Sequence, residues 1–340
     1  MPTSKNILVT GGVGYIGSHL TLSLLELGYN VIIVDNLSNS SIESLQRVKS
    51  IVGRKPFFVK GDIRDANLLK NIFYSYDIEA VLHLAGLKSV AESVNSPIKY
   101  YDNNFYGSQV LLKSMSDAKV FNLVFSSSAT VYGHKKEMPI KENSLDKTPL
   151  NPYGRSKLMV EDMLNDLAYS DSRWNIAILR YFNPVGAHSS GLIGEAPSGI
   201  PNNLVPYISQ VAIGKLKELT VFGNDYPTFD GTGVRDYIHV VDLAEGHLRA
   251  LEFIRTHVGF HVWNLGTGIG YSVLDVVRAF EAASGCSIPY RIVQRRAGDI
   301  AVCYADPTKA HHELGWKASR SLHDMMADSW RWQKFNPNGY

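Results

Sequence analysis

The feature that most constrains this chain is a cluster of glycines directly after its first apolar segment. The residues Asn6–Thr10 predict a buried strand, and GGVGYIG at residues 11–17 leads from it into a helical pattern over Ile16–Leu27. Glycines at these spacings permit a tight turn and close packing of the helix on the strand. The chain is therefore expected to begin with the first half of a β-α-β unit.

The same alternation continues through the first half of the chain. Helical patterns around Asn104–Ser116 and over Tyr153–Leu167 lie between short apolar runs. The further expected strands are Val31–Asp35, Pro56–Lys60, Ala80–Leu84, Leu123–Ser127 and Ala177–Arg180. Strands that alternate with helices predict an α/β fold, here a Rossmann-type doubly wound parallel sheet.

The pattern changes near residue 184, where Pro184–Pro206 is rich in Gly, Pro, Ser and Asn and predicts irregular structure. The later elements are expected as strands at Leu219–Phe222 and His261–Leu265 and helices at Val240–Ile254 and Ser272–Ala283. We expect a Rossmann domain over residues 1–183 and a smaller α/β substrate-binding domain over residues 184–340. A segment near residues 236–260 is expected to return to the first domain.

Composition excludes several classes of protein. The 340 residues hold 34 Lys and Arg against 32 Asp and Glu, and a net charge of +2 without basic blocks argues against a nucleic-acid partner. No stretch is apolar enough for a membrane span or a secretory signal, and the cysteines, Cys286 and Cys303, are too few for a disulfide framework. We expect a cytoplasmic protein with no membrane partner. The histidines lack metal-ligand spacing, so no metal is expected, and His134–Lys136 is expected to be a solvated loop.

The glycine turn also suits a pyrophosphate. A helix that starts after such a turn presents free N–H groups and the positive end of its dipole to a phosphate. Asp35 ends the second expected strand, where its carboxylate can accept hydrogen bonds from the ribose hydroxyls of NAD and would repel a 2′-phosphate. Asp62 ends the third strand, where an adenine contact and a plain structural turn are both open. These features predict an NAD site, with an ordinary tight turn as the alternative.

Two Tyr-x-x-x-Lys motifs are present, Tyr132…Lys136 and Tyr153…Lys157. On a helix this spacing puts both side chains on one face, so the ammonium lowers the pKa of the phenol and lets it act as a base. The first motif is followed by a segment without apolar periodicity and predicts a loop, whereas the second follows an Asn-Pro pair that favours a helix start. We therefore predict Tyr153 as the base and Lys157 as its activating cation.

Three consecutive serines, residues 126–128, end the fifth expected strand. A hydroxyl at this place can hydrogen-bond a substrate hydroxyl beside the nicotinamide and pass its proton towards Tyr153. We favour Ser128 as the catalytic hydroxyl and Thr130 as a second substrate contact. The alternative is a solvated strand end.

Longer motifs connect these pieces. They are SSSATVYG at 126–133, NPYGRSKLMVE at 151–161, LRYFNPVGAH at 179–188, GIPNNLVPYI at 199–208, FGNDYPT at 222–228, DGTGVRDYIHVVDLA at 230–244 and RRAGDIAVCYAD at 295–306. With these motifs in this order, the chain resembles the extended short-chain dehydrogenases/reductases and, within them, the UDP-galactose 4-epimerase family. The resemblance covers nearly the whole chain.

The resemblance implies an enzyme that keeps a bound NAD and interconverts UDP-galactose and UDP-glucose through a transient 4-keto sugar. It implies cofactor contacts at Gly11, Gly14, Tyr15, Ile16, Gly17, Asp35, Asn36, Asp62, Ile63, Ala85, Lys88, Asn103 and Lys157. It implies contacts to the UDP-hexose at Ser128, Thr130, Tyr153, Asn183, Asn203, Leu204, Phe222, Arg235, Tyr237, Arg296, Asp299 and Cys303. Arg235 and Arg296 suit a diphosphate clamp, because guanidinium pairs bidentately with phosphate.

The position of Cys303 bears on substrate breadth. Some bacterial members of the family carry Tyr there, so a small side chain implies room for a 2-acetamido group. The chain is thus also predicted to interconvert UDP-GlcNAc and UDP-GalNAc, against the alternative that Cys303 is only a buried small residue and the substrates are the plain UDP-hexoses.

Two other functions share this fold. A nucleotide-sugar 4,6-dehydratase needs an acid and a base after the catalytic hydroxyl, where this chain has Ala129-Thr130. A non-catalytic NAD sensor would be expected to lack Tyr153, Lys157 or Ser128. Both are therefore disfavoured. The family also implies a homodimer in which the helix after Asn104 and the Tyr153–Leu167 helix pair with those of a second subunit.

Overall fold

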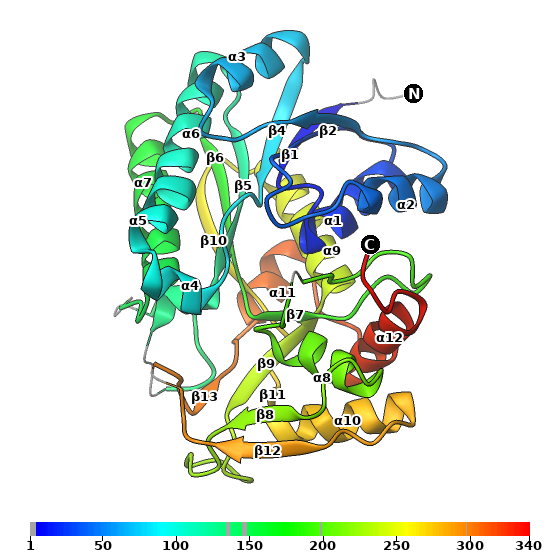
Figure 1. Cartoon of the computed structure of the whole chain (residues 1–340). Coiled ribbons are helices and arrows are strands. Elements are labelled where there is room, and N and C mark those ends of the chain that lie inside the picture. The colour runs from blue at the N-terminus through cyan, green and yellow to red at the C-terminus, as the bar shows by residue number, and fades with distance from the viewer. Residues whose placement is uncertain (1–4, 134–136, 145–147, 198, 297) are drawn as a thin grey trace.

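The computed structural model describes residues 5–133, 137–144, 148–197, 199–296 and 298–340. Within these residues the centre is one seven-stranded parallel sheet (Figure 1). From edge to edge its strands are β10 (Gly259–Leu265), β6 (Asn175–Tyr181), β5 (Asn122–Ser128), β4 (Ile78–His83), β1 (Asn6–Thr10), β2 (Asn30–Asp35) and β3 (Phe57–Lys60). The chain changes direction across the sheet between β1 and β4, and ligands bind at such a switch point beyond the carboxyl ends of the strands. The predicted Rossmann-type α/β fold is confirmed.

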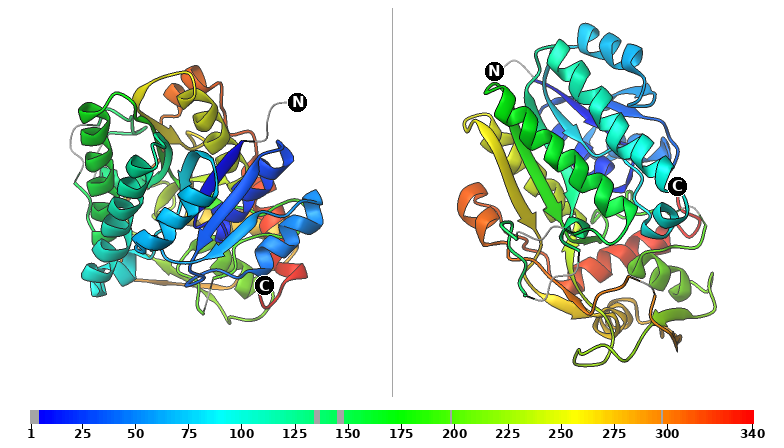
Figure 2. Two further views of the ribbon diagram at one scale, coloured as in Figure 1. Left: turned by 90° about the horizontal axis from the view of Figure 1, so that it is seen from above. Right: turned by 90° about the vertical axis from the view of Figure 1, so that its left-hand side faces the viewer.

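Helices cover both faces of this sheet because its strands are apolar on both sides. Ile7 and Val9 of β1 point into one core, and Leu8 between them points into the other. The first face carries α1 (Tyr15–Glu26), α2 (Glu43–Val52), α9 (Val240–Ile254) and α11 (Thr308–Leu314); the second carries α3 (Ala66–Ser75), α6 (Gly107–Asp117) and α7 (Pro152–Ser170). Figure 2 shows the two helical layers on either side of the sheet.

The long predicted helix around Asn104–Ser116 is less regular than expected. It is preceded by α4 (Val90–Asn95) and α5 (Pro97–Tyr100), and Tyr101–Tyr106 form a π-helix, η1, that continues into α6. A π-turn inside a helical run is typical of functional sites, since it re-aims the side chains that follow. A sequence pattern with a period of 3.6 residues does not reveal this one-residue widening.

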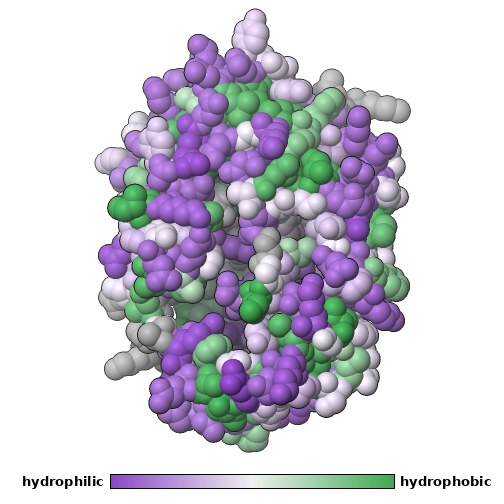
Figure 3. Space-filling view, in the orientation of Figure 1, coloured by the Kyte–Doolittle hydropathy of each residue, from purple (hydrophilic) through white to green (hydrophobic). Residues whose placement is uncertain are grey.

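Small sheets and helices form the lower part of the molecule in Figure 1. One sheet contains β7 (Asn183–Val185), β9 (Val234–His239), β11 (Gly270–Ser272) and β13 (Val302–Cys303), the other contains β8 (Leu219–Phe222) and β12 (Tyr290–Val293), and the helices are α8 (Leu204–Ala212), α10 (Val273–Ser284) and α12 (Leu322–Phe335). This part has its own apolar core, which includes Ile208, Phe280 and Met325. The surface is hollowed between the parallel-sheet part and the lower part (Figure 3).

Two sequence predictions for the second half differ from the structure. The strand at residues 261–265 was placed in the smaller domain, but β10 pairs with β6 as an edge of the parallel sheet. The irregular segment predicted from residue 184 begins inside β7 and ends inside α8. A short apolar run predicts a strand without specifying its partner. Helix α9, which packs beside α1 on the same face of the sheet, carries the chain back to the first part.

Among the residues that the structure describes, no helix combines the length and the apolar character needed to cross a lipid bilayer.

Candidate active site

Glycines in the turn at residues 11–17 differ in how much space surrounds them. A Cβ on Gly17 would lie 2.1 Å from the Gly11 carbonyl oxygen, so glycine is needed there for helix α1 to pack on the turn. A Cβ on Gly14 would meet only that same carbonyl, at 3.4 Å, and Gly14 is the N-cap of α1 without a side-chain cap. The turn thus leaves open space in front of an uncapped helix N-terminus, which suits an incoming phosphate.

Carboxylates lie at the ends of the next two strands, as predicted. Asp35 is buried, and it accepts hydrogen bonds from the backbone N–H of Val13 at 3.1 Å and from Ser40 Oγ at 2.9 Å. Asp62 accepts from Asn36 Nδ2 at 3.0 Å and from the Arg64 guanidinium, which holds the pKa of this carboxyl well below its usual range. Asp35 therefore ties the glycine turn to β2. The hydrogen bonds of Asp62 show that it stabilises the turn after β3.

Other predicted cofactor residues contribute through the backbone or through the wall of the crevice. The Ile63 side chain is buried in one core, so only its backbone atoms could contact a ligand, whereas Ile16 is partly buried against the opposite core. Ala85 follows β4, and its N–H donates to Thr10 Oγ1 at 3.3 Å. Asn103 lies half-buried in η1.

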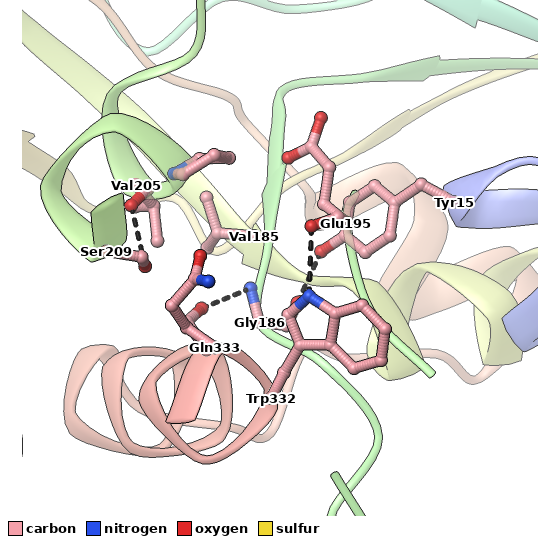
Figure 4. Close-up of a pocket in the computed structure, with 10 residues that line it drawn as sticks. Tyr15, Val185, Gly186, Glu195, Val205, Ser209, Trp332 and Gln333 are labelled. Carbon is pink, nitrogen blue, oxygen red and sulfur yellow. Dashed lines mark hydrogen bonds between the residues drawn. The ribbon is translucent and has the colours of Figure 1, made fainter. Parts of the chain in front are cut away.

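The side chain of Tyr15 has a role that the sequence did not predict. Its hydroxyl donates to the Gly186 carbonyl at 2.6 Å, which ties the glycine turn to the segment after β7. Figure 4 shows this contact beside a small pocket of about 20 Å³ that α12 closes with Trp332, whose indole donates to the Glu195 carbonyl at 3.0 Å. Burial raises the pKa of Tyr15 well above its ordinary value.

Glu195, which the sequence analysis did not single out, connects two predicted ligand contacts. Its Oε1 accepts from Lys88 Nζ at 2.8 Å and from Asn203 Nδ2 at 3.1 Å. Lys88 was predicted to contact the cofactor and Asn203 the UDP-sugar. The two candidate sites therefore meet at one carboxylate.

Tyr153 and Lys157 lie together at the start of α7. Asn151 caps this helix by accepting from the N–H of Gly154 at 2.9 Å, and Pro152 is its first residue. Lys157 is buried, and its Nζ donates to the Ser126 carbonyl at 2.9 Å. The predicted helix and its Tyr/Lys face are thus present.

The pKa of Tyr153 differs from the sequence prediction. Lys157 was expected to lower it, but burial raises the pKa of Tyr153, opposed by a hydrogen bond with Ser128. Burial also lowers the pKa of Lys157 to about 8, against the upward effect of Glu161. Desolvation disfavours the charged form of both groups, and motif spacing carries no information about desolvation.

Ser128 ends β5, as predicted, and is buried next to Tyr153. Its Oγ lies 3.0 Å from Thr130 Oγ1, so the two predicted substrate hydroxyls form one group. Tyr132 of the competing motif is fully buried in a 3₁₀ turn (Ala129–Tyr132, η2), where its hydroxyl donates to Asn264 Oδ1 at 2.7 Å. Lys136 and the predicted loop at His134–Lys136 lie outside the described residues.

A buried asparagine, also missed by the sequence analysis, supports this arrangement. Asn104 accepts from the N–H of Leu87 at 2.8 Å and donates to Ser156 Oγ at 3.1 Å. It thereby fixes the loop after β4 against α7, beside Lys157. In the sequence, Asn104 occupies a position where the helical pattern expects an apolar residue, and this could have indicated a buried hydrogen-bonding role.

The predicted sugar-nucleotide residues collect in the lower part of the molecule. In the four-stranded sheet, Asn183 of β7 is paired with Tyr237 of β9, and Cys303 of β13 is paired with Arg235 of β9. Leu204 begins α8, directly after Asn203. Burial raises the pKa of Tyr237 to about 12 and that of Cys303 to about 11, so both groups stay neutral at pH 7.

Aromatic and charged residues form the outer edge of this group. The Arg296 guanidinium lies 4.7 Å from the centre of the Phe222 ring, and its Nε donates to Asp299 Oδ2 at 3.0 Å. Near Asp299 and Arg296, the Tyr226 hydroxyl is buried and has no hydrogen-bond partner among the described residues. Its pKa is raised by burial and by Asp299. An unsatisfied buried hydroxyl beside these side chains suits a polar ligand.

Comparison with known proteins decides the family. The family model described as GDP-mannose 4,6 dehydratase matches residues 8–329. UDP-glucose 4-epimerase of Haemophilus influenzae is 60% identical over 334 residues, which cover 98% of this chain and 99% of that protein. This chain belongs to the UDP-glucose 4-epimerase family.

Solved structures of the family agree with this assignment. The UDP-glucose 4-epimerase of Bifidobacterium longum in complex with NAD⁺ and UDP is 55% identical, with a TM-score of 0.96, and the match covers 99% of this chain and 100% of that one. The enzyme of Stenotrophomonas maltophila with bound NAD and formylated UDP-arabinopyranose is 53% identical, with a TM-score of 0.96, and the match covers 98% and 99% of the two chains. The predicted membership of the extended short-chain dehydrogenases/reductases, and of the epimerases among them, is confirmed.

The dehydratase description of the matching family model and the epimerase relatives agree on the fold but differ in the reaction. Elimination of water needs an acid and a base beside the sugar. Ala129 and Thr130 follow Ser128 in the 3₁₀ turn η2, and neither titrates. Local chemistry therefore places the chain with the epimerases.

The residues of this epimerase-family chain fit NAD. The open space at Gly14 and the uncapped start of α1 suit a pyrophosphate, and Asp35 supplies hydrogen-bond acceptors for a ribose. Among the described residues no group of three or more His, Cys, Asp or Glu side chains is placed to hold a metal ion.

Proposed function

We propose that this chain is an NAD-dependent UDP-glucose 4-epimerase, which interconverts UDP-galactose and UDP-glucose through a transient 4-keto sugar. The observation that carries the proposal is the buried group Tyr153, Lys157 and Ser128 at the carboxyl end of β5. This group lies beside the switch point of the parallel sheet, where the cofactor of a Rossmann fold binds. Family membership supports the same reaction.

The cofactor would lie across the carboxyl ends of β1, β2 and β4. The turn at residues 11–17 would hold its pyrophosphate, Asp35 its adenosine ribose, and Lys157 and Asn103 the nicotinamide side. NAD supplies the hydride acceptor for C4 of the sugar and afterwards the hydride donor. All other steps depend on side chains of this chain.

Tyr153 would take the proton of the sugar 4-hydroxyl as C4 gives up its hydride, and would return the proton when hydride comes back to the opposite face. The hydroxyls of Ser128 and Thr130 hydrogen-bond the sugar oxygen and hold it close to the phenol. The Lys157 ammonium favours the phenolate against the effect of burial. A charge in a buried, water-free site has a larger effect than the same charge in water.

The lower part of the molecule would hold UDP while the sugar turns over. Arg235 and Arg296 pair with the diphosphate, Phe222 and Leu204 contact the base, and Asn183, Asn203, Tyr237 and Asp299 supply polar contacts. The buried Tyr226 hydroxyl is a further candidate contact. Because these contacts would bind the nucleotide and leave the hexose free to rotate, either face of C4 could lie against the cofactor.

The test is to incubate the purified protein with NAD and UDP-galactose and to follow the sugar products by NMR. Formation of UDP-glucose up to a fixed equilibrium ratio, from either sugar, supports the proposal. A 4-keto-6-deoxy product would assign the chain to the dehydratases. No turnover, with NAD bound, would favour a sensor.

Cys303 would widen the reaction to UDP-GlcNAc and UDP-GalNAc. It lies on β13 beside Arg235, so a larger side chain there would narrow the space next to the diphosphate clamp. The variant Cys303→Tyr is expected to lose the N-acetylated reaction while retaining that of UDP-galactose, and Cys303→Ser, which stays small, is the matched control. Equal retention of both reactions in Cys303→Tyr would contradict the gate.

The outer face of α7 would form a homodimer. A groove of about 480 Å³ lies there, and Tyr169 at the end of the helix is 94% exposed. The groove is lined by the apolar Phe105, Met159, Met163 and Leu167 and, among them, by Asp162, Asp166 and Ser170. A second copy of this helical face fits such an apolar strip as part of a four-helix bundle. Sedimentation should give the mass of two chains, and Met163→Asp should give the mass of one; a monomeric parent protein would exclude the dimer.

A further inference from the structure

A buried ion pair lies behind the active site, and the proposed reaction does not use it. Arg180 of β6 donates from Nη2 to Glu161 Oε2 at 2.6 Å and from Nε to Glu161 Oε1 at 3.0 Å. The two side chains are 2% and 1% exposed. Since a buried pair gives up the hydration of both charges, its net contribution to stability is small, and another role is worth seeking.

The pair is connected to the catalytic strand through Ser127. Glu161 Oε1 accepts from Ser127 Oγ at 2.6 Å. The neighbours of Ser127 are Ser126, whose carbonyl accepts from Lys157 Nζ, and Ser128, the proposed substrate hydroxyl. Glu161 thus holds the segment of β5 that positions both groups.

Glu161 also stands close to Lys157 along the helix. It follows Lys157 by four residues on α7, so the two side chains lie one turn apart on the same face. Its negative charge raises the pKa of the Lys157 ammonium, which burial has lowered to about 8. The Ser126 carbonyl and the Phe125 ring, whose centre lies 4.8 Å from Lys157 Nζ, also favour the ammonium, and a nearby anion adds to their effect.

The other titratable groups around Lys157 do not supply that anion. His83 on β4 acts on Lys157 directly, and the groups next to the residues that Lys157 contacts are Tyr153 on α7, Tyr100 on α5, Arg180 and Tyr181 on β6, and His247 on α9. Burial lowers the pKa of His83 to about 3 and that of His247 to about 4, so both are neutral at pH 7. None of these six side chains is a carboxylate, so among these groups Glu161 supplies the negative charge near Lys157.

We propose that Glu161 and Arg180 are positioning residues for the active-site lysine. Glu161 keeps the Lys157 ammonium charged next to Tyr153, and Arg180 holds the Glu161 carboxylate in place with hydrogen bonds from its Nε and Nη2. The inference rests on the proposed function of Tyr153 and Lys157. Neither positioning residue touches the substrate or the reacting atoms.

The test removes both charges together, because Glu161→Gln alone would leave a buried arginine unpaired. In the double variant Glu161→Gln/Arg180→Met, the new amide still accepts from Ser127 and the apolar chain fills the arginine site. Glu161→Asp keeps the charge and serves as the conservative variant. Tyr132→Phe is the matched control, since it removes a hydroxyl that accepts from Arg180 Nη1 at 2.9 Å and leaves every charge in place.

The primary readout is an NMR titration of the Lys157 side chain in protein without substrate, assigned by its disappearance in Lys157→Met. Removing Arg180 partly offsets the effect of removing Glu161, so the pKa of Lys157 is expected to fall in the double variant by less than the roughly one to three units of a lone ion pair. It should lie nearer to the parent value in Glu161→Asp and stay at the parent value in Tyr132→Phe. In the epimerase assay, the high-pH fall of kcat/KM should move to lower pH by the same amount.

A folded double variant with an unmoved Lys157 pKa would overturn the inference, and so would an equal shift in Tyr132→Phe. Should the double variant fail to fold, Ser127→Ala decides: it frees Glu161 from β5, so a smaller downward shift is expected, and no shift overturns the inference. The titration needs no turnover. If the protein has no epimerase activity, the proposed function is refuted. The NMR titration would still test whether Glu161 raises the pKa of Lys157.

Discussion

The two walls of the proposed site are built differently. On the parallel-sheet side the chemical groups are buried and held by the protein: Lys157 donates to a strand carbonyl, and Asp35 accepts from the glycine turn. On the lower side Arg296 is 52% exposed and Phe222 37% exposed, and the candidates come from well-separated segments. The comparison indicates that the proposed reacting groups are preorganised, whereas the proposed nucleotide contacts Arg296 and Phe222 are still partly in solvent.

The largest effect should come from the preorganised side. Tyr153→Phe is expected to lower kcat about a thousandfold, since it removes the general base, and to leave NAD content unchanged. The matched control is Tyr132→Phe, which alters the competing motif and should keep turnover within a few-fold of the parent. Rates of UDP-glucose formation measure both. Loss of turnover in Tyr132→Phe alone would reverse the assignment of the two motifs.

The nucleotide side should respond mainly in binding. Arg235→Met is expected to cost about 1.5–3 kcal/mol of UDP affinity, the range for a hydrogen bond to a charged group, with a smaller change in kcat. Arg296→Met should cost less, because this residue is half-exposed and already paired with Asp299. Calorimetric titration with UDP compares the two. Equal losses of UDP affinity in the two variants would show that the exposure of a side chain does not predict its contribution to UDP binding.

Substitutions at Gly17 and Gly14 should separate the effect on protein stability from the effect on NAD binding on the parallel-sheet side of the site. Gly17→Ala puts a methyl against the Gly11 carbonyl and should destabilise the protein by about 1–3 kcal/mol, seen as a lower Tm without NAD. In Gly14→Ala the new methyl meets only the Gly11 carbonyl oxygen, at the ordinary contact distance of 3.4 Å. The Tm without NAD should therefore hold, while NAD affinity falls by about tenfold. If Gly14→Ala binds NAD like the parent, the pyrophosphate does not lie over this turn.

The pH dependence should follow the buried lysine. With a Lys157 pKa of about 8, raising the pH above 8 removes the ammonium proton and with it the charge that favours the Tyr153 phenolate. Turnover is then expected to fall, by up to about tenfold per pH unit. In Lys157→Arg the rate is lower, but this high-pH fall should vanish, because guanidinium stays charged. A fall that persists in Lys157→Arg would have to come from another group.

Local patterns predicted much of the catalytic wall. The glycine turn, the strand-ending Asp35 and the Tyr153–Lys157 face all depend on residues near each other in the chain, and the spacing of a turn or a helix sets their geometry. The roles of Tyr15 and Glu195 were missed. Their partners, Gly186 and Lys88, lie more than a hundred positions away in the sequence.

Short-range periodicity and sterics were enough to predict the alternating strands and helices of the first half, the site of the glycine turn and the pairing of a phenol with an ammonium. Long-range packing settles that β10 joins β6, that Cys303 lies beside Arg235 and that Arg180 meets Glu161. It also decided the direction of the Tyr153 pKa. Strand partners and burial depend on how distant segments pack around one core, and a charge buried there is governed by its lost hydration more than by its neighbours in the sequence.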